Sequence, residues 1–126
     1  MTTRRAVLAG AGATALIGAV PAAEDKTMYG LIGRMTAKPG QRAALAQILM
    51  DGLDGMPGCL SYIVAEDPAN ADDLWITEVW DGADSHRASL SLPAVRDAIV
   101  KGRPLIAGMD RHTETRPLGG FGLAAG

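Results

Sequence analysis

Four segments of the chain have residue patterns typical of β-strands, in which alternate residues lie on opposite faces; the first three are rich in hydrophobic residues and the fourth is mostly polar. They comprise residues 28–38, 59–66, 74–81 and 109–116. The polar stretch over residues 67–73 is typical of a turn, so the second and third segments are expected to pair as antiparallel strands. The fourth segment is polar with alternating threonines, which favours a strand exposed on one face or paired with another subunit.

Helical signals fall between these strands. From residue 41 an apolar stripe with helical spacing runs to Leu53. Helix-start residues precede a short helix over 85–91, and Pro93 suits the first turn of another helix that should end or kink near Gly102. The order β-α-β-β-α-β predicts an α+β, ferredoxin-like fold with an antiparallel four-stranded sheet. Helices would cover one face of this sheet, so a partner subunit is expected on the other face.

The third strand holds both tryptophans of the chain, and neither of its faces is purely polar, which predicts a central position. Glu78 falls among apolar neighbours and needs a partner or a raised pKa there, because an isolated ionised carboxylate is costly to bury. A bridge to Arg34 or Arg87 would supply that partner. His86 follows Trp80 closely, so a carboxylate, an indole and an imidazole form the candidate site. Period two places Leu74, Ile76, Glu78 and Trp80 on one face of the strand, and Trp75, Thr77 and Val79 on the other.

The first 23 residues have the features of a twin-arginine signal peptide. Arg4 and Arg5 precede an apolar run rich in glycine and alanine, and small residues at 21–23 suit cleavage. The run is too short and too rich in glycine for a good membrane span; a retained N-terminal anchor or a disordered leader is the alternative. We therefore expect a periplasmic or secreted protein with no membrane attachment after cleavage. Its domain would cover residues 24–117, and a flexible tail residues 118–126.

Composition narrows the classes of function. Twelve basic residues stand against 14 acidic ones, for a formal net charge of −2, and the absence of a basic run argues against nucleic acid. Cys59 is the only cysteine, so no internal disulfide can form. His112 is predicted on a strand surface, too isolated to form a metal site with His86. No P-loop, zinc-site or Ser-His-Asp motif is present, and we predict no metal.

Five short motifs follow one another along residues 27–117. They are Lys38-Pro39-Gly40-Gln41, Pro57-Gly58-Cys59-Leu60-Ser61-Tyr62, Glu66-Asp67-Pro68, Glu78-Val79-Trp80-Asp81 followed by His86, and Leu92-Pro93-Ala94-Val95. In order and spacing they resemble the antibiotic biosynthesis monooxygenase family, in its quinol-monooxygenase-like group of dimeric α+β barrels. The resemblance implies a homodimer that oxidises a quinol or polycyclic phenolic substrate with molecular oxygen and without a cofactor.

The resemblance also implies roles for individual residues. His86 would be the catalytic base, because an imidazole exchanges protons around neutral pH, and Glu78 would orient the imidazole or the indole. Trp80 and Tyr62 would wall the site or stack on an aromatic substrate, and Arg34 would hold an oxyanion. A structural role is the alternative for each residue. The alternative function is a non-catalytic dimeric module that binds a small aromatic ligand or haem in the same cavity.

Overall fold

The structure, a computed structural model, describes residues 27–53 and 55–123. The predicted signal peptide, residues 1–23, lies outside this part of the chain, so its assignment stays a prediction. Among the helices that the structure describes, each is too short or too polar to cross a membrane.

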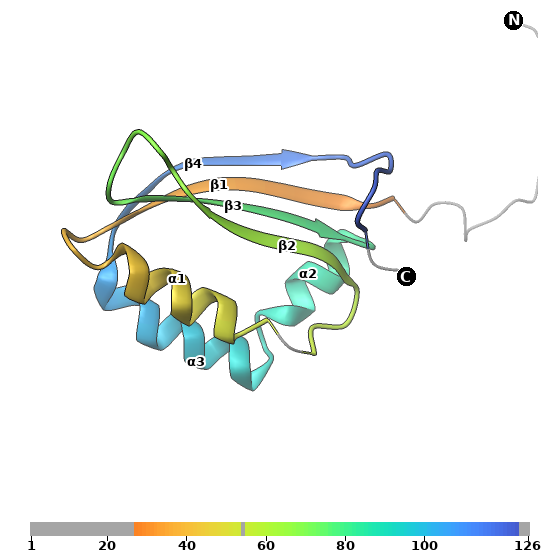
Figure 1. Ribbon diagram of the computed structural model, residues 1–126. Coiled ribbons are helices and arrows are strands. Elements are labelled where there is room, and N and C mark those ends of the chain that lie inside the picture. The colour runs from red at the N-terminus through yellow and green to blue at the C-terminus, as the bar shows by residue number, and fades with distance from the viewer. Residues whose placement is uncertain (1–26, 54, 124–126) are drawn as a thin grey trace, which may run out of the picture.

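The described chain forms one four-stranded sheet with its helices on one face (Figure 1). In chain order the elements are β1 (Tyr29–Ala37), α1 (Arg42–Asp51), β2 (Cys59–Glu66), β3 (Asp73–Trp80), α2 (Ala83–Ser89), α3 (Pro93–Gly102), the 3₁₀ turn η3 (Arg103–Leu105) and β4 (Ile106–Thr115). The strand order is β2-β3-β1-β4, and every neighbouring pair is antiparallel. This arrangement confirms the predicted ferredoxin-like α+β fold, and β3 occupies the predicted interior position.

Two elements start two or three residues earlier than the sequence predicts. β4 begins at Ile106, three residues earlier than predicted, because Pro104 lies in η3 and the chain enters the sheet directly after that turn. A bond from the Lys38 backbone N–H to the Leu105 carbonyl, 2.8 Å long, fixes this entry beside the end of β1. α2 begins two residues earlier than predicted, at Ala83, directly after the extended Gly82.

The hydrophobic core lies between the sheet and the helices. Its buried members are Ala37, Leu45, Leu74 and Ile76. Both β3 members of this cluster, Leu74 and Ile76, belong to the face that was predicted to hold Glu78 and Trp80 as well, so the two-residue period divided the residues of this strand correctly. Glu78 and Trp80 continue the same face toward α2, and the core therefore leads directly to the candidate site.

The opposite face of the sheet carries no helix of the described chain (Figure 1). Ile32 and Ile63 pair with Thr77 from its two sides, and both isoleucines are exposed, at 40% and 56%. Trp75, which lies on this face, is half-buried by its neighbours. A partner subunit on this face stays a prediction.

Candidate functional site

A cavity of about 240 Å³ lies between the sheet and the three helices. Its walls are mostly apolar and come from β1, β2, β3, β4 and all three helices, together with the residues that follow α1. A concave, mainly apolar space with a few polar groups is the usual form of a small-molecule site. The polar side chains that reach it are Tyr62, Glu78, His86, Ser89 and Arg103.

Glu78 and Trp80 form a hydrogen-bonded pair on the cavity face of β3. The indole Nε1–H of Trp80 donates to Glu78 Oε1 at 2.9 Å, and Trp80 is only 1% exposed. The predicted bridge from Glu78 to an arginine is wrong. Arg34 pairs with Asp110 and Arg87 with Asp84, because those carboxylates lie nearer on the surface. Glu78 therefore faces the cavity, and its half-buried carboxylate accepts a hydrogen bond from the indole N–H rather than from a guanidinium.

His86 projects from α2 toward the same carboxylate. Its Nε2 lies 3.9 Å from Glu78 Oε1, which is beyond hydrogen-bond distance. The Trp80 ring meets the imidazole edge-on, with ring centroids 5.4 Å apart. The Ser89 hydroxyl donates to the backbone carbonyl of His86 at 2.6 Å and helps to hold this short helix. The imidazole is thus held beside the cavity, and its Nε2 makes no hydrogen bond to Glu78.

Tyr29 is a second aromatic neighbour of His86, and sequence reasoning missed it. The two rings are 5.4 Å apart and inclined at 35°. The Tyr29 hydroxyl donates to Glu114 Oε2 at 2.6 Å. Tyr29 lies opposite Trp80 in the pairing of β1 with β3, and this register is what brings the two rings to one imidazole. The only sequence signal was the position of Tyr29 at the start of the first strand.

Tyr62 reaches the cavity from β2, where it pairs directly with Glu78. Burial raises the pKa of the Tyr62 hydroxyl, and the negative charge of Glu78 raises it further. The phenol therefore stays protonated at neutral pH and can donate a hydrogen bond. Within the described residues, no hydrogen-bond partner is found for this hydroxyl, which leaves it available to a ligand.

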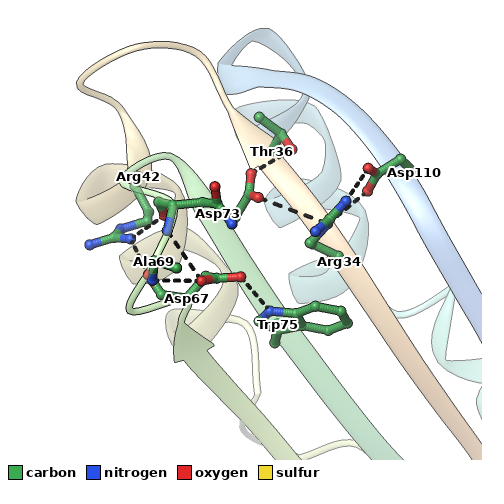
Figure 2. A network of polar contacts seen from close by, with 9 residues as sticks. Arg34, Thr36, Arg42, Asp67, Ala69, Asp73, Trp75 and Asp110 are labelled. Carbon is green, nitrogen blue, oxygen red and sulfur yellow. Dashed lines mark hydrogen bonds and ion pairs between the residues drawn. The ribbon is translucent and has the colours of Figure 1, made fainter.

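Arg34 lies on the other face of the sheet, away from these residues. Figure 2 shows its guanidinium between Asp110 and Asp73, and the group also lies 5.5 Å from the centre of the Trp75 ring. The structure therefore brings His86, Glu78, Trp80 and Tyr62 together but does not bring Arg34 to them. At the cavity itself the positively charged side chain is Arg103.

The described residues contain no group of three or more His, Cys, Asp or Glu side chains placed to hold a metal ion. His112 lies exposed on β4, paired with Gly33 across the sheet. It occupies the strand-surface position predicted for it.

Residues 28–101 match the family model of the antibiotic biosynthesis monooxygenases. A structure from Chloroflexus aurantiacus that carries the name of this family is 63% identical, covers 78% of this chain and 100% of its own, and superposes with a TM-score of 0.76. Among curated proteins, none matches the chain.

More distant structures share the fold. A variant of SnoaB, a cofactor-independent oxygenase from Streptomyces nogalater, is 15% identical, covers 75% of this chain and 97% of its own, and has a TM-score of 0.63. A Nitrosomonas europaea protein of unknown function is 21% identical over 80% of this chain and 98% of its own, with a TM-score of 0.64. The family match covers more than half of the chain, and the protein belongs to the antibiotic biosynthesis monooxygenase family.

Proposed function

We propose that the protein is a cofactor-independent monooxygenase that oxidises a phenolic or quinol substrate with molecular oxygen. The observation that carries the proposal is the convergence of His86, Glu78 and Tyr62 on one mainly apolar cavity. Such chemistry needs a base for a phenolic proton, a stabilised negative charge and a space that excludes water. Membership of a monooxygenase family supports the same class of reaction.

His86 is the base in this proposal. Because Nε2 is not hydrogen-bonded to Glu78, it can accept the proton of a substrate hydroxyl in the cavity. The Glu78 carboxylate then lies beside the imidazolium that forms and stabilises its charge. Tyr62 donates its hydroxyl hydrogen bond to the new phenolate, the role first expected of Arg34. Trp80 supplies an aromatic wall and holds Glu78 in place.

The proposed reaction needs no external reductant. The phenolate gives one electron to O₂, which yields a phenoxyl radical and superoxide. These combine in a new carbon–oxygen bond at a ring carbon that carries hydrogen. The O–O bond of the resulting hydroperoxide then breaks as water leaves and the ring carbon becomes a carbonyl. Substrate and O₂ are thus converted to a quinone and one water, so the substrate supplies all four electrons.

The size of the cavity favours small substrates. An apolar cavity of about 150 Å³ is enough for benzene. The cavity here, at about 240 Å³, therefore suits one ring or two fused rings rather than three or four. Glu78, His86 and Ser89 lie at the β3–α2 end, whereas Met35 and Ile106 line the other end, where Arg103 also reaches the cavity. A substrate would place its hydroxyl at His86 and its hydrocarbon ring toward those apolar residues.

Oxygen uptake by the purified, chelator-treated protein tests the proposal against a panel of one-, two- and three-ring hydroquinones. We expect uptake with the smaller compounds, and a loss of about 100-fold or more in His86→Ala, as for removal of a general base. His112→Ala is the matched control and should keep full activity. Equal turnover by His86→Ala would contradict the base assignment. Silence across the panel with quenching of tryptophan fluorescence by the same compounds would favour the alternative, a non-catalytic ligand-binding module.

Two further features belong to the proposal. Export rests on the paired arginines 4 and 5 and the apolar run after them.

Homodimerisation through the open sheet face is supported by the exposed Ile32 and Ile63, because exposed apolar patches commonly mark interfaces. Analytical ultracentrifugation should find a dimer for the wild type and a monomer for Ile63→Lys. A wild-type monomer would contradict the dimer.

A further inference from the structure

We propose that Tyr29, held in place by Glu114, is a positioning residue for His86. The inference rests on the proposed role of His86 as the base and deepens it. The imidazole is close to two rings from adjacent strands, Trp80 on β3 and Tyr29 on β1, each with its centroid 5.4 Å away. Both rings are themselves anchored through a polar atom to a carboxylate, Trp80 to Glu78 and Tyr29 to Glu114.

The backbone is built to allow the second anchor. Glu114 lies on β4 and pairs with Leu31, so its side chain is on the same face of the sheet as that of Tyr29. Between them, Gly30 brings β1 close to the end of β4. A Cβ at position 30 would lie 2.1 Å from Thr115 Oγ1 and 2.9 Å from the Pro117 ring. The ends of β1 and β4 therefore approach each other closely at this point, and the Tyr29 hydroxyl lies 2.6 Å from Glu114 Oε2.

The Tyr29 ring lies where it can restrict the movement of the His86 side chain. Tyr29 lines a surface hollow together with Thr27, Ala83 and Glu114, whereas His86 lines the interior cavity. The Tyr29 ring is therefore the wall between the imidazole and this hollow. Without the Tyr29 ring, the His86 side chain could adopt other staggered rotamers. Nε2 would then point into the cavity in a smaller fraction of the molecules.

The anchor should hold across the working pH range. The hydrogen bond to Glu114 is the main reason that the pKa of the Tyr29 hydroxyl is raised, and burial and the charge of Glu78 act in the same direction. Arg87 acts in the opposite direction. The phenol therefore remains a protonated donor at neutral pH, and its bond to a carboxylate is of the stronger, charge-assisted kind.

The test measures the side-chain rotamers of His86 by NMR in the full protein, without substrate. The chain has two histidines, so the imidazole signals of His112 give an internal reference on the same sheet. Tyr29→Leu removes the ring. Glu114→Ala removes only the anchor, at an exposed residue where folding is not at risk, and Glu114→Gln restores a hydrogen-bond acceptor.

We expect His86 to hold one rotamer in the wild type and to average over several in Tyr29→Leu. Glu114→Ala should show partial averaging, and Glu114→Gln should recover most of the order. Turnover in Tyr29→Leu should fall by about tenfold to a hundredfold, mainly in kcat rather than in KM, as for a misplaced catalytic group. A single His86 rotamer in both Tyr29→Leu and Glu114→Ala would overturn the proposal, as would averaging that reaches His112 equally.

The two proposals fail in different ways. If His86→Ala retains turnover, the base assignment fails, whereas the rotamer measurement still decides whether Tyr29 holds the imidazole. If His86→Ala is inactive and Tyr29→Leu keeps both the single rotamer and full kcat, the base stands and the positioning role is wrong.

Discussion

Trp80 donates its indole N–H to the carboxylate of Glu78, two residues earlier on the same strand face. The bond satisfies a fully buried indole and gives a half-buried carboxylate a partner inside an apolar cavity. It also fixes the carboxylate 3.9 Å from His86 Nε2. The pair therefore links the core of the fold to the candidate site.

Replacing Trp80 with Phe should destabilise the protein by about 1–3 kcal/mol, because Glu78 loses its donor while a ring is kept. Urea unfolding at pH 7 measures the change in the free energy of unfolding. Trp75→Phe is the matched control, since Trp75 also donates its N–H to a carboxylate, that of Asp67, but at the more exposed face. Its cost should be clearly smaller, and equal costs would contradict a special role for the buried pair.

Gly58→Ala should be more damaging than Gly40→Ala. Both glycines have positive φ, 84° and 78°, where a Cβ costs about 1–2 kcal/mol. At position 40 a Cβ would meet no atom within 4 Å, whereas at position 58 it would lie 2.4 Å from Ser85 Oγ at the start of α2. Urea unfolding of both variants separates the clash from the backbone strain. Because Ser85 neighbours His86 in the chain, Gly58→Ala should also lower turnover, and matching stability of the two variants would refute this contact.

Asp67 should contribute stability that is lost in acid. The indole N–H of Trp75 is the main cause that lowers the pKa of this carboxyl, followed by the backbone N–H of Ala69 (Figure 2). A lowered pKa means stability that is present above about pH 4, where the unfolded carboxyl is ionised, and lost as pH falls through the folded pKa. Urea unfolding should show Asp67→Asn to be less stable than the wild type at pH 6, and the difference should shrink toward pH 3. A difference that is the same at both pH values would contradict this.

The sequence was sufficient for the faces of the strands but not for their register. Alternation along β3 correctly put Glu78 and Trp80 on one face, and His86 had to be near because α2 follows β3 almost directly. The contact of Tyr29 with His86 depends on the pairing of Tyr29 with Trp80, which no local pattern reveals. Register is fixed by contacts between distant segments, so it emerges only in the folded chain.

The sequence also led to the expectation that Arg34 lies at the candidate site, and the reason is related. Alternation in the first strand places Arg34 on the opposite face from Leu31 and Met35, but it does not indicate which face the helices cover. The structure places Met35 at the cavity and Arg34 among the carboxylates of the open face. Similarly, the partner of Glu78 could not be chosen from sequence, because the candidate arginines had nearer carboxylates whose positions depend on the fold.

The most direct test of the central claim is the fate of the oxygen atoms. Turnover of a two-ring phenol under ¹⁸O₂, followed by mass spectrometry of the quinone, should find one labelled oxygen in the product of the wild-type protein. A parallel reaction in H₂¹⁸O corrects for exchange of the new carbonyl with water. His86→Ala should form little product of either kind, and His112→Ala should match the wild type. An unlabelled product under ¹⁸O₂, or no product at all with bound phenol, would contradict a monooxygenase.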